Sequence, residues 1–155
     1  MTIQRDLRDF SILVVAEREL LRRILACMLK GECCARILAV ESARDAISAL
    51  HREHYHLMLC DQAICPDPAD LLYQVRSGRA GCIRDIPAVL LTHRNTPGLP
   101  DMADILQVHS CLTRPVTSEQ LRDAIIDAIE DPVALREPYA YRVVVEPPSF
   151  LGEER

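Results

Sequence analysis

The sequence predicts an α/β protein whose five parallel strands form one doubly wound sheet. Short apolar runs alternate five times with amphipathic segments along the chain. Runs this apolar are typical of parallel strands that are covered on both faces, and alternating helices supply that cover. The chain has 155 residues, 49% of them apolar, which is enough for one domain with a sizeable core. We therefore expect a (βα)5 architecture with its ligand site at the carboxyl ends of the strands.

The five apolar runs predict the strands. The first reads SILVV and the third HLMLC, and both consist mainly of residues that favour buried positions. A proline precedes the fourth run, which reads AVLL. The predicted strands span 11–15, 35–40, 56–60, 88–91 and 110–113.

The first helix is predicted over 17–30, where apolar residues recur at helical spacing. Gly31 follows it and fits a helix stop. We expect one apolar stripe of this helix to face the sheet. The stripe consists of Leu20, Leu21, Ile24, Leu25 and Met28.

The remaining helices are predicted from caps and apolar spacing. Ser42 is expected to cap a helix that reaches about residue 53, and Ser118 one that reaches about residue 130. Between them, helices are predicted over 69–77 and 101–109.

The composition changes after residue 131. Residues 1–131 form the predicted domain, and residues 132–155 are richer in proline and are predicted to be a C-terminal extension. Within this extension, residues 139–145 have the composition of an additional strand.

Charge and cysteine content narrow the function classes. The formal net charge of −5 argues against binding to nucleic acid or to anionic membranes, which require basic patches. The seven cysteines lie mostly in apolar surroundings, and the charged N-terminus lacks the apolar core of a signal peptide. We expect a cytoplasmic protein without disulfides. Of the 18 cationic side chains, only Lys30 is a lysine.

Polar residues follow four of the predicted strands. Glu17 follows the first strand, Asp61 the third, Thr92 the fourth and Arg114 the fifth. Parallel strands end at one edge of the sheet, so these side chains are expected to converge there.

Four stretches, ILVVAE, HLMLCD, DIPAVLLT and LTRPVTSEQL, together resemble the receiver domain of response regulators in two-component signalling. The resemblance covers about residues 10–130. It implies a flavodoxin-like, CheY-like fold. It also implies a signalling module that exchanges phosphoryl groups with a histidine kinase or a phosphotransfer protein.

The resemblance assigns a role to each of the strand-end residues. Asp61 matches the phospho-acceptor, and Thr92 and Arg114 match the positions that contact the phosphoryl group. Pro115 matches a proline with a cis peptide bond, an isomer that X-Pro bonds tolerate. The family's Mg²⁺ cofactor would be held here by Glu17, Asp61 and the backbone carbonyl of Ala63.

Five departures from the family pattern concern this site, and one of them is the loop after Asp61 (QAICPDPAD), which is one residue short. Ala16 replaces the first of two metal-binding acids, which weakens the predicted Mg²⁺ site. Arg114 stands where the family has lysine, and it could instead pair with Asp61. His93 would narrow access to Asp61, and Cys111 replaces a switching aromatic residue.

The leading hypothesis is a single-domain receiver whose output is protein–protein contact, without enzymatic activity. Its partner, or a second copy, would use the surface formed by residues 101–130. One alternative is an unphosphorylated pseudo-receiver that acts as a dimeric scaffold. A weaker alternative is a cyclic-dinucleotide binder that uses three arginines of the extension, Arg136, Arg142 and Arg155.

Two minor alternatives concern the segment before and after Asp61. His51, His54 and His56 could bind a metal together with Cys60. Cys60 and Cys65 flank Asp61, so their oxidation could act as an input.

Overall fold

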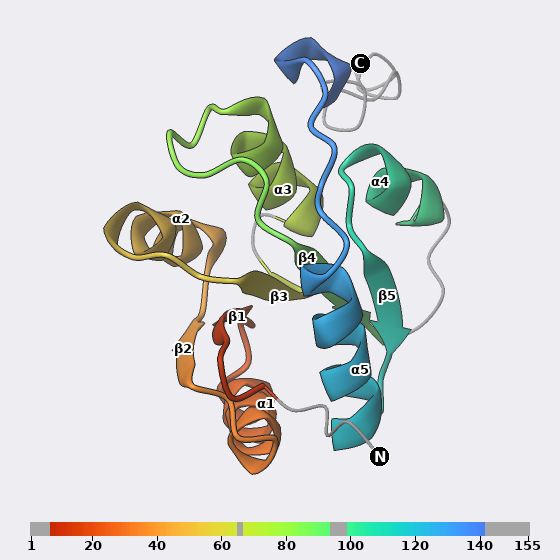
Figure 1. Ribbon diagram of the computed structural model, residues 1–155. Helices are drawn as coiled ribbons and strands as arrows, with labels where there is room; N and C mark the ends of the chain where they lie inside the picture. The colour runs from red at the N-terminus through yellow and green to blue at the C-terminus, as the bar shows by residue number, and fades with distance from the viewer. Residues whose placement is uncertain (1–6, 65–66, 94–98, 142–155) are drawn as a thin grey trace.

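Five parallel strands form one sheet with the order β2-β1-β3-β4-β5 (Figure 1). The structure is a computed structural model that describes residues 7–64, 67–93 and 99–141. This architecture confirms the predicted fold class, and every strand lies at its expected place. The strands are β1 (Ser11–Val15), β2 (Arg36–Val40), β3 (Leu57–Asp61), β4 (Ala88–Thr92) and β5 (Ser110–Thr113).

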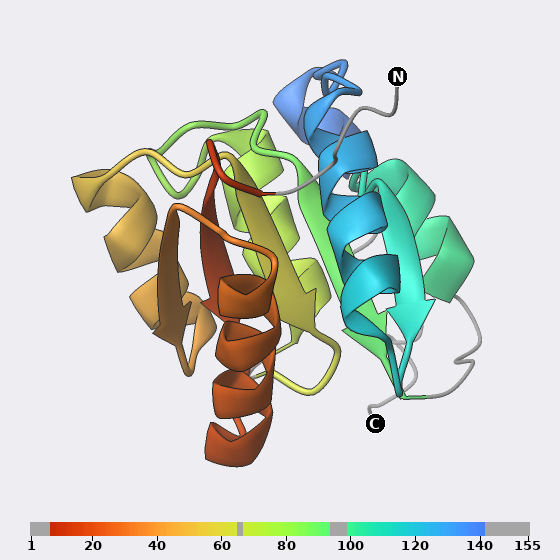
Figure 2. The ribbon, with the colours of Figure 1, turned by 60° about the horizontal axis from the view of Figure 1, so that its bottom comes forward.

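Five α-helices connect and follow the strands and cover both faces of the sheet. In Figure 2, α1 and α5 lie in front of the sheet, and the other three helices lie behind it. No helix in the described part of the chain is long and apolar enough to cross a membrane. The helices are α1 (Glu19–Gly31), α2 (Ala43–Arg52), α3 (Pro68–Ser77), α4 (Leu99–Ile105) and α5 (Ser118–Ile129).

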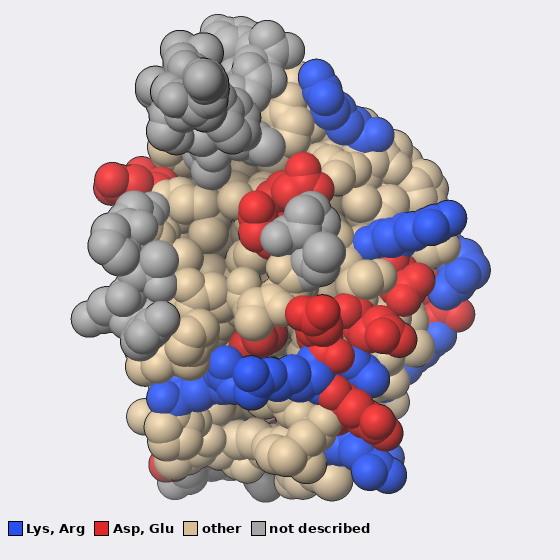
Figure 3. Space-filling model, turned by 180° about the vertical axis from the view of Figure 1, so that it is seen from behind, with Lys and Arg blue, Asp and Glu red and all other residues tan. Residues whose placement is uncertain are grey.

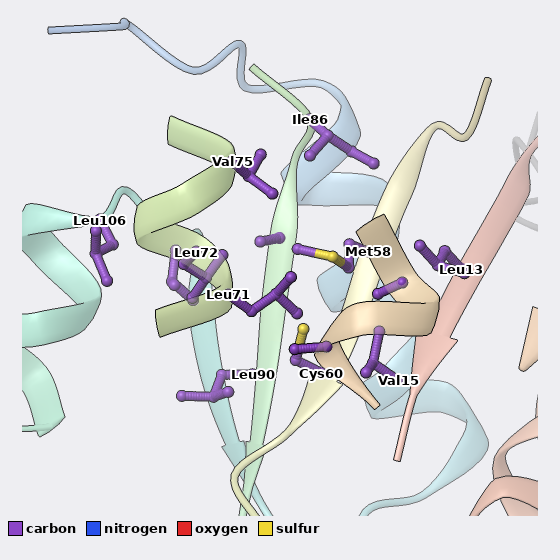
Figure 4. Packing of buried hydrophobic residues seen from close by; sticks show 14 of the residues in the cluster. Leu13, Val15, Met58, Cys60, Leu71, Leu72, Val75, Ile86, Leu90 and Leu106 are labelled. Carbon is purple, nitrogen blue, oxygen red and sulfur yellow. The ribbon is translucent and has the colours of Figure 1, made fainter. Parts of the chain in front are cut away.

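Alternation along the strands divides the core into two layers. On β3, Leu57 and Leu59 face α1 and α5, whereas Met58 and Cys60 pack against α2 and α3 (Figure 4). All five residues of β3 are buried, because helices cover both of its faces. By this alternation Asp61, the last residue of the strand, belongs to the side of α1 and α5.

Helix starts follow the expected chemistry with one correction. Ser42 caps α2 as predicted, because its hydroxyl accepts a hydrogen bond from the Asp45 N–H. The prediction that Ser118 caps α5 was wrong. Thr117 is the N-cap, and Gln120 completes a reciprocal capping box with it.

The apolar stripe of α1 was predicted only in part. Leu25 is 2% exposed and faces the sheet, but Leu20 is 70% exposed and Ile24 is 47% exposed. Leu29, which lies one turn after Leu25, is fully buried instead. The buried face of α1 is therefore rotated away from Leu20 and towards Leu29.

The described part of the extension is irregular over residues 132–137 and helical at its end. Pro138–Tyr141 forms a short 3-10 helix, η1, so residues 139–141 do not form the predicted strand. Residues 142–145 lie outside the described residues.

The corrected orientation of α1 predicts different costs for two adjacent substitutions. Leu25→Ala should lower the free energy of unfolding by about 2–5 kcal/mol, because it leaves a cavity in the core. Ile24→Ala should change it by about 0.5 kcal/mol or less, because this side chain is already half exposed. Urea denaturation of both variants measures the difference, and equal losses would contradict the orientation of α1 described here.

Candidate functional site

The carboxyl ends of β1, β3, β4 and β5 meet at one edge of the sheet and bring the predicted residues together. Backbone hydrogen bonds extend beyond the strands at this edge. The N–H of Gln62 donates to the Leu91 carbonyl at 2.8 Å, and the N–H of Arg114 donates to the Thr92 carbonyl at 2.6 Å. These bonds hold the residues that follow β3 and β5 against the end of β4.

Asp61 is a buried carboxylate with one satisfied and one unsatisfied oxygen. Its side chain is 2% exposed. Oδ2 accepts a hydrogen bond from the Ala63 N–H at 3.1 Å. Oδ1 is buried and has no hydrogen-bond partner among the described residues. Leaving a buried acceptor unpaired costs about 1–3 kcal/mol, so this atom is available to a ligand.

Arg114 supplies the positive charge that balances Asp61. Its Nη2 lies 3.5 Å from Oδ1 of Asp61, a distance of an ion pair rather than of a strong hydrogen bond. Nε of Arg114 is also buried without a hydrogen-bond partner among the described residues. The Arg114–Pro115 peptide bond is cis.

The other predicted residues take different positions around this pair. Thr92 ends β4 and is 3% exposed. His93 is exposed and lines a groove together with Arg114. Cys111 is exposed on β5, and Ala63 is exposed in the loop after β3.

Arg22 belongs to this edge and was missed by the sequence analysis. Its Nη1 donates to the backbone carbonyls of Ala16 and Glu17, both at 2.8 Å. The guanidinium thus closes the turn between β1 and α1, and the side chain of Glu17 remains exposed. A basic residue five positions after Glu17 was the only signal in the sequence, and many exposed helical arginines have the same spacing.

The donor set at this edge fits Mg²⁺ weakly. Mg²⁺ in proteins is commonly held by one or two carboxylates and keeps several waters. Glu17 and Asp61, whose Oδ1 has no hydrogen-bond partner among the described residues, supply two such carboxylates. Within the described ranges, however, no group of three acidic, histidine or cysteine side chains could hold a metal. The fixed charges of Arg22 and Arg114 also oppose a divalent cation.

An apolar groove opens beside the site. It has a volume of about 360 Å³ and lies between α1 and the segment that leads from β5 into α5. Arg114 and His93 line its polar rim. The apolar lining is formed by Leu21, Ile24, Leu25, Met28, Leu91, Pro115 and Val116.

The two minor alternatives find little support in the structure. Burial, and secondarily the charge of Asp61, raise the pKa of the Cys60 thiol to about 12, so the thiol is protonated and unreactive at neutral pH. Cys65 lies outside the described residues. Nδ1 of His56 accepts a hydrogen bond from the Ser11 N–H at 3.0 Å. This contact lies where β1 and β3 begin, at the edge of the sheet opposite the end of β3.

Comparison with solved structures identifies the fold. A sensor protein from a Polaromonas species is 23% identical and has a TM-score of 0.69, and the match covers 79% of this chain and 98% of that one. The receiver domain of a sensor histidine kinase from Pseudomonas aeruginosa, crystallised with a magnesium ion in its active-site cleft, is 18% identical. Its TM-score is 0.67, and the match again covers 79% and 98%.

A chemotaxis response regulator of Vibrio cholerae is 13% identical with a TM-score of 0.63, and the match covers 78% of this chain and 96% of that one. No protein-family model matches the chain, and no curated protein matches it by sequence. The chain therefore has the CheY-like fold that these receiver domains and response regulators share.

The ion pair at the site predicts a measurable coupling between Arg114 and Asp61. Arg114→Met should lower the free energy of unfolding at pH 7 by about 1–3 kcal/mol, because it leaves a buried carboxylate without a cation. In the background of Asp61→Asn the same substitution should cost about 1 kcal/mol less. Urea denaturation of the four proteins of this cycle gives the coupling.

Arg23→Met, on the exposed surface of α1, is the matched control and should change the stability by no more than about 0.5 kcal/mol. A coupling indistinguishable from zero would show that the two side chains do not interact in solution.

Proposed function

We propose that this chain is a receiver of two-component signalling, in which Asp61 accepts a phosphoryl group. One observation carries the proposal. Oδ1 of Asp61 and Nε of Arg114 are both buried and unpartnered among the described residues, and the two side chains approach to 3.5 Å. A phosphoryl group on Oδ1 would offer oxygens to Arg114 and satisfy both atoms.

The chemistry follows from these positions. Oδ1 of Asp61 attacks the phosphorus atom of the donor, and a new O–P bond forms. The P–N or P–O bond of the donor breaks, and the leaving group takes its electron pair. Arg114 binds the transferred oxygens, which carry the charge, and Thr92 lies at the end of the neighbouring strand as the hydroxyl contact.

Mg²⁺ would be a weakly bound cofactor of this site. Glu17, Asp61 and the carbonyl of Ala63 are the groups that would hold it. When bound, it would neutralise charge on the phosphoryl oxygens. The arginines of the site already supply part of that charge, which supports a lower dependence on the metal.

Protein contact, rather than catalysis, is the proposed output. The Pseudomonas receiver of similar fold belongs to a sensor histidine kinase, and we propose a histidine kinase or a phosphotransfer protein as the donor. The surface of residues 101–130 is the proposed contact for a target or a second copy. Figure 3 shows a row of basic side chains bordered by acidic ones on one face, and the net charge of −5 supports a protein rather than a nucleic acid as the partner.

A second candidate is a pseudo-receiver that is never phosphorylated. The ion pair between Arg114 and Asp61 supports it, because a guanidinium can neutralise the carboxylate without any phosphoryl group. The same phosphorylation experiment separates the two candidates.

Incubation with acetyl phosphate and Mg²⁺ should add one phosphoryl group, about 80 Da, to the intact protein by mass spectrometry. Asp61→Asn should abolish the adduct, because it removes the nucleophile. Asp70→Asn, on α3 just after the same loop, is the control and should leave the adduct unchanged. No adduct at high Mg²⁺ would favour the pseudo-receiver, and an adduct retained in Asp61→Asn would assign phosphorylation to another residue.

Restoring the missing acid should strengthen metal binding. Ala16 is fully buried directly after β1, so Ala16→Asp adds a buried carboxylate whose charge a bound cation would balance. Without metal this variant should be less stable than the parent protein. Its melting temperature should rise more steeply with Mg²⁺ than that of the parent. Ala16→Asn is the matched control, and equal responses of all three proteins would contradict the site described here.

A further inference from the structure

Residues 132–141, here called the strap, run over the surface at the edge of the sheet opposite Asp61, and Tyr141 at the end of the strap is buried in the core. In Figure 1 the strap rises from α5 to η1, and β5 points away from it. Tyr141 is fully buried and belongs to the same apolar cluster as Val75 of α3 and Leu106. Tyr141 therefore anchors the end of the strap in the core of the domain.

Gln107, in the turn between α4 and β5, joins the strap to the domain. Its Oε1 accepts a hydrogen bond from the Tyr141 hydroxyl at 2.7 Å. Its Nε2 donates to the carbonyl of Ala134 in the strap. The same hydroxyl of Tyr141 accepts from the Arg136 N–H at 2.8 Å, which folds the strap back on itself.

The backbone of this turn is held in an unfavourable conformation. Gln107 has φ +62°, which costs a residue with a side chain about 1–2 kcal/mol. Part of this cost is met by the backbone cap that ends the helical turn after α4, in which the Val108 N–H donates to the Ala103 carbonyl at 2.8 Å. The strap and Arg76 of α3, whose Nη2 donates to the Gln107 carbonyl at 3.1 Å, add further contacts that hold this turn.

Arg76 is a buried cation that the strap helps to enclose. It is fully buried, and its Nε donates to the Leu106 carbonyl at 2.9 Å. Burial lowers the pKa of Arg76 to about 10, so the side chain stays charged at neutral pH. Its Nη1 donates to the carbonyl of Arg84 at 2.7 Å, and Arg84 in turn donates to the strap at the carbonyl of Arg136.

The strand β5 connects this network to the site. It is an edge strand and pairs only with β4, so its position depends strongly on what holds its two ends. Gln107, which the strap holds, lies in the turn just before β5. At its end stands Arg114, which contacts Asp61. Six residues lie between Gln107 and Arg114, and four of them form β5, which is about 13 Å long.

We propose that the strap is a latch for β5: when docked through Tyr141 and Gln107, it holds the strand in the position that places Arg114 beside Asp61. Release of the strap relaxes the turn at Gln107 and frees β5. Because coupling between two sites is reciprocal, loss of the Arg114–Asp61 pair also loosens the strap. The latch requires the ion pair alone and therefore does not depend on whether Asp61 is phosphorylated.

Hydrogen exchange of the full-length protein, followed by mass spectrometry, tests the latch from the strap. Tyr141→Ala should increase amide exchange at least tenfold both in residues 134–141 and in residues 106–114. Exchange in β1 and β2 should not change, which separates a local effect from global unfolding. If Tyr141→Ala does not fold, Tyr141→Phe keeps the ring, removes only the hydroxyl and should raise exchange in both segments about threefold.

The reciprocal test starts at the site. Arg114→Met should raise exchange in residues 134–141 about threefold, although it lies at the other end of β5. Leu135→Ala, at a strap residue that is 41% exposed, is the control and should change neither segment. Faster exchange of the strap with full protection of residues 106–114 would overturn the proposal and leave the strap a passive cover of the core. An unchanged strap in Arg114→Met would overturn it equally.

Discussion

Full burial of the middle strands is the constraint on which the rest of the structure depends. All residues of β3 and β4 are buried, so helices must cover both faces of the sheet. Parallel neighbours then require a crossover between each pair of strands, and every strand ends at the same edge. The candidate site follows from that arrangement, because polar residues such as Asp61 and Thr92 lie at the carboxyl ends of the buried strands, which meet at this edge.

The electrostatics of this edge differ from those of a site built around a divalent cation. A buried carboxylate stays charged only with a nearby cation or strong hydrogen bonds. At Asp61 that role is divided between Arg114 and the N–H of Ala63. Arg22 fills the turn beside Ala16, where the missing carboxylate would have stood. Fixed guanidinium groups therefore supply positive charge at this edge of the sheet.

The two outer strands of the sheet, β2 and β5, are covered in different ways. The other outer strand, β2, is followed by α2, which packs in the main core cluster. At the beginning of β5 the chain instead uses its own extension, with Tyr141 buried against α3 and the turn before the strand. The extension therefore adds to the core at the edge opposite the site, and one short strand links the two edges.

The sequence by itself determined the five strands and the positions of Asp61 and Arg114 relative to them, because apolar runs and the residues that end them are local patterns. It could not determine which side of α1 is buried, since Leu20 and Leu29 are equally apolar and only packing against the sheet selects between them. Tertiary structure alone placed Arg22 on the carbonyls beside the site and buried Tyr141 in the core. The Tyr141 contact joins segments far apart in the chain, and the Arg22 contact, although it spans only five or six residues, depends on how the chain turns from β1 into α1.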